Sequence, residues 1–209
     1  MSSRDIERRV AGYYSGKLAE HGTTPRGVDW NSEASQTLRF EQFMPLVPSD
    51  GPVSVLDFGC GYAAFAEHLE AAGVDAAYTG YDISPEMVQA ARVTHGERPD
   101  RVFTADRGAL QPADVVVASG IFNVLAGTDR ESWAEYVGGT LSELASLSRH
   151  GLAFNMLTSY SDADRMVERL FYGDPCHYFD WCKRNLSRHV ALLHDYGLYE
   201  FTILVRFDA

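Results

Sequence analysis

The stretch that most constrains the fold is VSVLDFGCGYAAF, residues 53–65. It begins with a short apolar run rich in β-branched residues, 53–58, which is typical of a buried strand. Gly59 and Gly61 follow at once, and the next segment, 62–72, is rich in Ala with apolar residues at helical spacing. We therefore predict a strand, a glycine turn and a helix. In such a unit, backbone N–H groups and a helix N-terminus can approach a ligand closely.

Two acidic residues mark the ends of the first two predicted strands. Asp57 stands two residues before Gly59, and Asp82 ends the apolar run 76–81, 23 residues after Gly59. A nicotinamide site sets its glycine loop against a diphosphate, which a carboxylate at Asp57 would repel. Asp57 instead suits a ligand amino group, and Asp82 lies about where a carboxylate binds ribose in such units. The pattern disfavours a nicotinamide dehydrogenase.

The segments VLDFGCGYA and YDISPEMVQAAR together resemble motifs I and II of class I S-adenosylmethionine (SAM) dependent methyltransferases, of the small-molecule type. Ala64 stands where the family has its third glycine. The resemblance implies SAM as cofactor and S-adenosylhomocysteine (SAH) as product. It also implies a doubly wound α/β fold, with a seven-stranded sheet in the order 3-2-1-4-5-7-6 and strand 7 antiparallel.

Apolar runs and amphipathic segments alternate along the chain, which predicts a parallel sheet with helices on both faces. We predict one domain, 1–209, with a helical cap or lid at 1–47 and a Rossmann-like core at 53–207. The predicted helices are 3–21, 33–47, 62–72, 85–94, 129–148, 162–171 and 175–186. The predicted strands are 53–58, 76–82, 101–105, 113–119 and 152–157, followed by a hairpin of 189–196 and 198–207 around Gly197.

The resemblance implies cofactor contacts at the ends of several strands. Asp57 and the glycine loop would hold the methionine part of SAM, and Asp82 would bind both ribose hydroxyls. Met87 would contact adenine or belong to the core, and Asp106 would contact the adenine amino group or be a turn residue. The candidate cofactor-binding residues are Asp57, Gly59, Cys60, Gly61, Asp82, Ile83, Met87, Ala105, Asp106, Ser119, Gly120, Tyr14 and Trp30. Tyr14 and Trp30 belong to the predicted cap, where an aromatic face suits a sulfonium or packs as part of a core.

The candidate catalytic residues follow the fourth and fifth predicted strands. Asn123 comes four residues after the strand 113–119 and would position the acceptor. His177 and Tyr178 lie in an aromatic segment that could wall the active site. A base is needed only for a poorly acidic hydroxyl or a protonated amine. His177, His189 and His194 are candidates for it, although a lone histidine is more often a structural or surface residue than a base.

Composition limits the partners. The formal charge is −11, which disfavours nucleic acid and anionic membranes and favours a small neutral or cationic acceptor. Three irregularly spaced cysteines argue against disulfides or a zinc site, and we expect a cytoplasmic protein with no membrane span. The predicted function is methyl transfer to an oxygen or nitrogen of a small molecule, such as a sugar or natural-product intermediate. The alternative is a SAM-binding regulator or partner subunit without catalysis.

Overall fold

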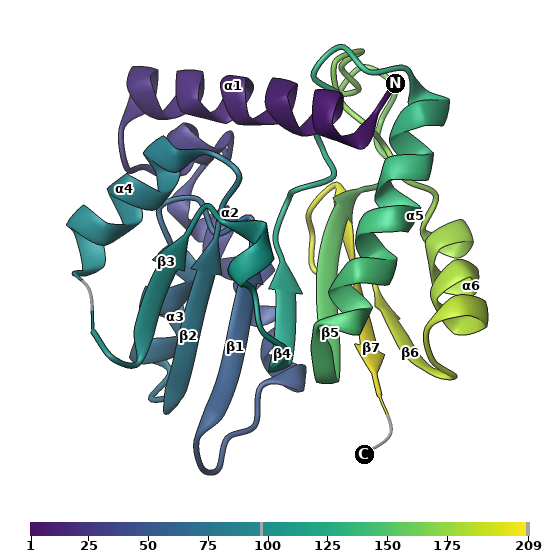
Figure 1. Cartoon of the computed structure of the whole chain (residues 1–209). Helices are drawn as coiled ribbons and strands as arrows, with labels where there is room; N and C mark the ends of the chain where they lie inside the picture. Colours follow the sequence, from purple (N-terminus) through teal and green to yellow (C-terminus); the bar gives the residue numbers. More distant parts are fainter. Residues whose placement is uncertain (97, 208–209) are drawn as a thin grey trace.

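The computed structural model describes residues 1–96 and 98–207; Glu97 and the last two residues of the predicted domain, Asp208 and Ala209, lie outside the described residues. Its seven-stranded sheet has the order β3-β2-β1-β4-β5-β7-β6 (Figure 1). β1 to β5 pair in parallel, and β7 is antiparallel to β5 and β6. The predicted strand order is therefore confirmed. The strands are β1 (Val53–Phe58), β2 (Ala76–Tyr81), β3 (Arg101–Thr104), β4 (Ala113–Ala118), β5 (Ser148–Leu157), β6 (His189–Leu193) and β7 (Glu200–Arg206).

Helices cover both faces of the sheet (Figure 1). α5 (Arg130–Ser146) and α6 (Pro175–Asn185) share one buried cluster with the sheet, and α2 (Glu33–Glu41), α3 (Ala64–Ala71) and α4 (Pro85–His95) share the other. Trp133 on α5 is fully buried and donates its indole N–H to the Phe122 carbonyl at 3.0 Å. Burial of such a side chain stabilises the fold by about 2–3 kcal/mol. No helix among the described residues has the length and apolar character that crossing a membrane requires.

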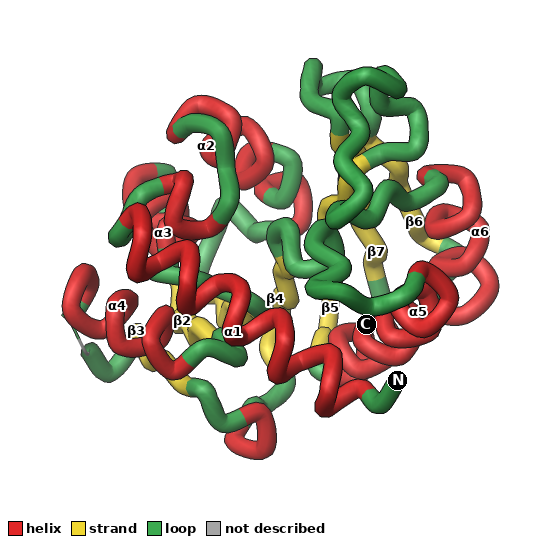
Figure 2. Tube along the Cα trace, turned by 90° about the horizontal axis from the view of Figure 1, so that it is seen from above, coloured by secondary structure: helices red, strands yellow, loops and turns green. Residues whose placement is uncertain are grey.

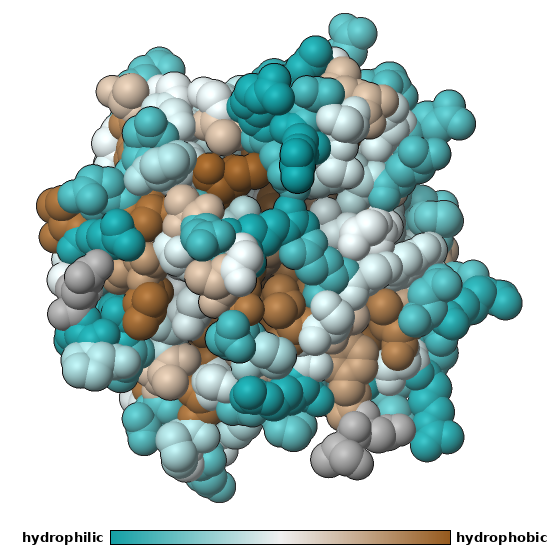
Figure 3. Space-filling model, viewed as in Figure 1, coloured by the Kyte–Doolittle hydropathy of each residue, from teal (hydrophilic) through white to brown (hydrophobic). Residues whose placement is uncertain are grey.

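The N-terminal helix α1 (Ser3–His21) lies across the carboxyl edge of the parallel strands, as Figures 1 and 2 show from two directions. Ser15 on α1 hydrogen-bonds to Ser84 and Glu86 at the start of α4, both at 2.9 Å. Hydrophobic atoms are visible directly below α1 in Figure 3. The predicted N-terminal cap is thus a layer above the edge where ligands bind in open α/β sheets.

Two predicted helices differ from the structure. The segment 33–47 divides into α2 and a short 3₁₀-helix, η2 (Met44–Leu46), because Pro45 lacks the N–H that an α-helix would need there. The segment 162–171 is not a helix; it contains turns, and its last residues bond to the segment after β4, with Leu125 N–H donating to Arg169 C=O at 3.1 Å and Phe171 N–H to Asn123 C=O at 2.8 Å. The helix prediction for 162–171 was wrong, because these tertiary bonds replace the i to i−4 bonds.

Candidate active site

A cavity lies between the cap and the carboxyl ends of β1, β2 and β4, with an empty volume of about 890 Å³ including its open part. The residues around it come from α1, the loop before α2, α2 itself, the glycine loop and the segment after β4. The predicted cofactor residues that line it are Asp57, Gly59, Cys60, Gly61, Asp82, Ile83, Met87, Ser119, Gly120, Tyr14 and Trp30. We call this the first cavity.

The glycine loop forms the floor of the first cavity. Gly59 and Gly61 have φ of 83° and 56°, which an L side chain rarely adopts. A Cβ at Gly59 would lie 2.3 Å from the Ile121 side chain, and one at Gly61 would lie 2.8 Å from Val28 of the cap. Ala63 is also left-handed, with φ 65°, so α3 begins at Ala64 and not at residue 62. The loop therefore needs glycine both for its backbone conformation and for close approach.

Two buried carboxylates stand at the ends of β1 and β2. Asp57 is 2% exposed and accepts a hydrogen bond from the Tyr78 hydroxyl at 2.6 Å. Burial raises its pKa to about 7, although the Tyr78 bond acts in the opposite direction. Asp82 accepts from the N–H groups of Gly61 and Ser84, both at 2.8 Å, and burial raises its pKa to about 6. Both carboxylates would be stabilised as anions by a ligand that supplies a cation or further hydrogen-bond donors.

The loop after β4 offers a hydroxyl without a partner. Ser119 lines the first cavity, and its buried Oγ has no hydrogen-bond partner among the described residues. Buried polar groups are normally paired, so this hydroxyl is an exception next to the first cavity. The neighbouring Gly120 N–H donates to the Asn155 side chain at 2.6 Å, which fixes the loop.

Trp30 of the cap presses on the same loop. A Cβ at Gly120, where φ is 72°, would lie 2.3 Å from the Trp30 ring. The guanidinium of Arg39, on α2, lies 3.9 Å from the centre of the Trp30 ring. Tyr14 on α1 also lines the first cavity, and burial raises its pKa above the ordinary value. The two aromatic residues of the cap that we singled out from the sequence therefore both reach the cavity.

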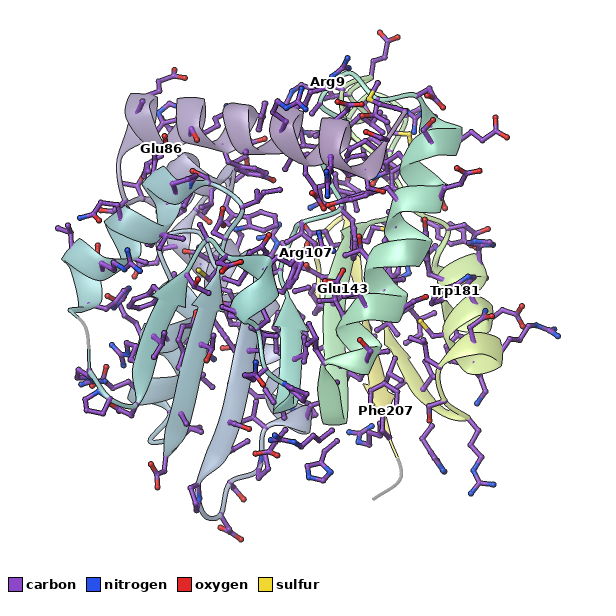
Figure 4. The ribbon with its side chains drawn as sticks, in the orientation of Figure 1. Arg9, Glu86, Arg107, Glu143, Trp181 and Phe207 are labelled. Carbon is purple, nitrogen blue, oxygen red and sulfur yellow. The ribbon has the colours of Figure 1, made fainter. Side chains whose placement is uncertain are left out.

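Two predicted cofactor residues do not reach the first cavity. Ala105 and Asp106 are exposed after β3, and Asp106 accepts from the Gly108 N–H at 2.9 Å as the cap of a 3₁₀-helix, η3 (Arg107–Ala109). The turn interpretation of Asp106 fits this geometry. Arg107 lines the cavity instead. It pairs with Glu7 on α1 and Glu143 on α5, and Figure 4 shows Arg107 and Glu143 pointing toward each other.

A second cavity adjoins the first and shares Tyr14, Val28, Trp30 and Gly120 with it. Its empty volume is about 1310 Å³, again including the part open to solvent. Its remaining wall comes from the cap, the segment after β4, the loop between β5 and α6 and the turn between β6 and β7. The charged residues that line it are Asp29, Arg39, Arg165, Arg169 and Glu200.

The three predicted catalytic residues have different positions. Asn123 is buried, lines the second cavity and accepts from the Leu157 N–H at 3.0 Å. His177 is exposed on α6, and Tyr178 packs in the core between the rings of Phe171 and Phe201. Neither His177 nor Tyr178 lines either cavity, because α6 runs along the sheet and only the loop before it reaches the edge. The prediction that His177 and Tyr178 contact the acceptor does not agree with these positions.

Several cavity residues were not predicted from the sequence. The cap contributes Val10, Val28, Gln36 and Phe40 to the first cavity, and Tyr62 of the glycine loop donates its hydroxyl to Gln36 at 3.1 Å. Arg107, Tyr81 and Tyr136 complete another part of the wall. Tyr62 and Tyr81 lie within the two motifs, and this was the signal available for them. The others come from segments whose distance from the motifs in the sequence gives no indication of contact.

A glycine loop on β1 and buried carboxylates at the tips of β1 and β2, on a sheet of this order, define a class I SAM-dependent methyltransferase. A family model described as "methyltransferase domain" matches residues 56–145 of the chain. The chain belongs to this family, since it is 50% identical over 163 residues to Rv1506c of Mycobacterium tuberculosis, a methyltransferase by name, and covers 98% of that protein and 78% of its own length.

A second relative is more distant. It is a malonyl-(acyl-carrier protein) O-methyltransferase of Pectobacterium atrosepticum, 31% identical over 134 residues, which are 62% of this chain and 49% of the relative. The match therefore spans about half of that protein.

Solved structures share the fold at low sequence identity. The N-methyltransferase NodS of Bradyrhizobium japonicum, crystallised with SAH, has a TM-score of 0.66 at 15% identity, over 95% of this chain and 98% of NodS. The 1,6-didemethyltoxoflavin-N1-methyltransferase of Burkholderia thailandensis also has a TM-score of 0.66, at 14% identity over 99% and 90% of the two chains. These likenesses concern the architecture.

Proposed function

We propose that this protein transfers the methyl group of SAM to an oxygen or nitrogen of a small molecule, such as a sugar or natural-product intermediate. The observation that carries the proposal is the pair of cavities that meet at Trp30 and Gly120. The first fits a cofactor and the second has room for another small molecule. Both lie under the cap at the carboxyl edge of the sheet, where open α/β folds bind ligands.

The residues of the first cavity fit SAM. Asp57 would hold the amino group, and Asp82 would accept hydrogen bonds from the ribose hydroxyls. Trp30 and Tyr14 supply aromatic faces for the sulfonium. Ile83 and Met87 provide an apolar wall for adenine. The relatives crystallised with SAH support the same cofactor.

When bound, SAM would supply a methyl group on a sulfonium sulfur, which leaves as the neutral thioether SAH when an acceptor with a free electron pair takes the methyl group. The task that remains for the chain is to align the acceptor and to exclude water. Asn123 lies in the second cavity beside Gly120 and can orient the acceptor. The residues that line the second cavity include no histidine, and its two acids are both in ion pairs. An acceptor that releases its proton to water fits this set best.

The names of the relatives also support a small acceptor. The Burkholderia enzyme was crystallised with 1,6-didemethyltoxoflavin, and the Bradyrhizobium enzyme is an N-methyltransferase. A cytoplasmic location, and the expectation that nucleic acid and membranes are not substrates, stay predictions from the sequence.

The test is methyl transfer from radiolabelled SAM, with a pool of small metabolites set against bulk DNA, RNA and protein. We expect label in the small-metabolite pool. Faster, salt-sensitive labelling of a nucleic acid would overturn the small-molecule proposal. Tight SAM and SAH binding without any transfer would favour the non-catalytic regulator. A protein that binds NAD and not SAH in calorimetry would refute the cofactor assignment as well.

A further inference from the structure

Arginines outnumber acids among the described residues that line the second cavity, although acids outnumber basic residues in the whole chain. The protein has a formal charge of −11, yet three arginines and two acids line this cavity. Arg39 and Glu200 neutralise each other in a buried pair, with Arg39 Nε and Nη2 donating to the two carboxylate oxygens at 2.7 and 2.5 Å. The other charged residues that line the second cavity are Arg165, Arg169 and Asp29.

Asp29 does not cancel both arginines. Its carboxylate contacts Lys17 at 3.1 Å, the Tyr13 hydroxyl at 2.7 Å and Arg169 at 3.1 Å. Burial alone would raise its pKa, but the hydrogen bonds from Tyr13, Lys17 and Arg169 outweigh burial and hold the pKa below its usual value. Asp29 is therefore ionised at neutral pH, and it is shared between Lys17 and Arg169. Arginines outnumber acids by three to two among the described residues that line the second cavity, while two further acids stand beside it: Asp164 next to Arg165, and Asp162, which accepts from the Tyr199 hydroxyl.

Both arginines keep donors for a ligand. The side-chain hydrogen bonds of Arg169 to described residues all involve Nη1, and the side chain is 49% exposed. The nearest acid to Arg165 is Asp164, at 4.0 Å, and the Arg165 side chain is 69% exposed. A guanidinium has five N–H donors in a planar fork that matches carboxylate and phosphate oxygens. In both residues most of this fork is not used by the described part of the chain.

The loop that carries the two arginines is held in place by the core. Arg169 C=O accepts from Leu125 N–H at 3.1 Å, Val167 N–H donates to the Tyr172 hydroxyl at 2.9 Å, and Gly173 N–H donates to Leu157 C=O at 2.8 Å. An isolated bridge joins Val124 to Leu170. The guanidinium groups are thus presented from a fixed backbone, which lowers the entropy cost of binding a ligand between them.

We propose that the acceptor of this methyltransferase is a small anion, and that Arg165 and Arg169 bind its carboxylate or phosphate group at the open end of the second cavity. This rests on the proposed function, because it takes the second cavity as the acceptor site. It departs from the neutral or cationic acceptor that the charge of the whole chain suggested. The guanidinium donors at the site decide recognition more than the charge of the whole chain does, since salt screens charges beyond about 10 Å. The methyl group goes to another oxygen or nitrogen of the same molecule, near Trp30 and Gly120.

The test titrates three probes into the full-length protein saturated with SAH, at constant ionic strength: benzoate, phenylphosphate and the neutral benzamide. Calorimetry measures each affinity. We expect both anions to bind more tightly than benzamide. Arg165→Gln and Arg169→Gln should each weaken anion binding by about three- to tenfold, as partly exposed charged hydrogen bonds do. The matched control is Arg184→Gln on α6, an exposed arginine paired with Asp180 outside both cavities, which should change it less than about twofold.

The outcomes separate this inference from the proposed function. Benzamide binding as tightly as benzoate, anion binding lost equally in the Arg184 control, or no anion binding by an SAH-saturated protein would each overturn the anionic acceptor and leave the SAM assignment standing. Failure of the wild-type protein to bind SAH would instead refute the proposed function. The ratio of phenylphosphate to benzoate affinity then decides between a phosphate and a carboxylate group.

Discussion

Asp57 is a carboxylate in surroundings that favour its neutral form. Burial raises its pKa to about 7, and the only hydrogen bond that the described residues give it comes from Tyr78. A cationic amino group of a ligand would supply the missing opposite charge. The cost of burying Asp57 is therefore offset when the ligand binds, which is a common arrangement at functional sites.

This arrangement predicts a pH-dependent affinity for SAH. Below about pH 7 the Asp57 carboxyl of the free protein holds a proton, and a bound amino group requires that proton to leave. We expect the affinity to rise by up to about tenfold per pH unit as pH increases toward 7, and then to level off. Calorimetry between pH 5 and pH 7.5 measures the slope.

Asp57→Asn is the matched variant for this prediction. It should bind SAH more weakly and show a flatter profile, with a smaller slope left below about pH 6 from Asp82, whose pKa is raised to about 6. The full wild-type slope in Asp57→Asn would mean that another group controls the pH dependence.

The contact between Gly120 and Trp30 predicts how Gly120→Ala changes stability and SAH binding. Gly120→Ala adds a methyl group that would lie 2.3 Å from the Trp30 ring, at a φ of 72°. Gly73→Ala is the control, because Gly73 has φ 73° and no atom within 4 Å of the added carbon. Each variant should lose about 1–2 kcal/mol of unfolding free energy from the left-handed backbone. Only Gly120→Ala should weaken SAH binding, by about tenfold or more; equal affinities in the two variants would show that Trp30 does not shape the site.

At the scale of elements, the sequence predicted the strands and helices whose patterns are local. Two apolar strands, each ending at an acid, and the helices after them follow from neighbouring residues, and their order in the sheet follows from the family resemblance. The prediction of a helix at 162–171 was wrong, because Val167 and Leu170 have helical spacing but line the second cavity. Periodicity detects an apolar face, and it cannot tell whether the partner of that face is the sheet or a cavity.

A buried ion pair joins an element of the cap to the last strand. Arg39 on α2 pairs with Glu200 on β7, and Glu200, 1% exposed, also accepts from Asn155 on β5 at 3.0 Å. Asn155 in turn accepts from the Gly120 N–H. This network fixes α2, and with it Trp30, relative to the loop after β4. We infer that the α2 half of the cap is a permanent layer and does not open.

The ion pair predicts a specific pattern of stabilities. Arg39→Met leaves Glu200 as an unpaired buried charge and should cost about 3–5 kcal/mol of unfolding free energy in urea denaturation. Arg39→Met combined with Glu200→Met should recover most of that loss, since apolar replacement of a buried pair is often neutral. The exposed pair of Arg184 and Asp180 is the control, and Arg184→Met should cost under about 1 kcal/mol. A double variant as unstable as Arg39→Met would show that the network has a role beyond charge compensation.

At the scale of the whole molecule, the site is assembled from segments that are far apart in the sequence. The SAM motifs lie within residues 53–92, and they predicted the floor of the first cavity. Its roof comes from α1, Trp30 and Gln36, and the second cavity adds Arg165, Arg169 and Glu200. Contacts between such distant segments depend on how the cap packs on the sheet edge. No spacing rule contains that information. His177 and Tyr178 were therefore predicted as catalytic residues, although it is the loop before them that lines the second cavity.

The cap as a whole gives the last prediction. Arg26 is exposed in the loop between α1 and α2, and two and four residues later Val28 and Trp30 line both cavities. A ligand in the first cavity would hold this loop against the glycine loop, where Val28 meets Gly61. Trypsin cleavage after Arg26 should therefore slow by about tenfold or more in the presence of saturating SAH, because cleavage requires local opening of the loop.

Cleavage after Arg188 is the internal control for this experiment. Arg188 is exposed in the turn between α6 and β6, at the opposite edge of the sheet from the two cavities (Figure 1). Cleavage there should proceed at the same rate with and without SAH, unless SAH stabilises the whole fold, in which case both sites slow together. Equal rates at Arg26 with and without a ligand that calorimetry shows to bind would mean that the 22–31 loop does not respond to the cofactor. The cap would then be rigid in both of its halves, α1 as well as α2.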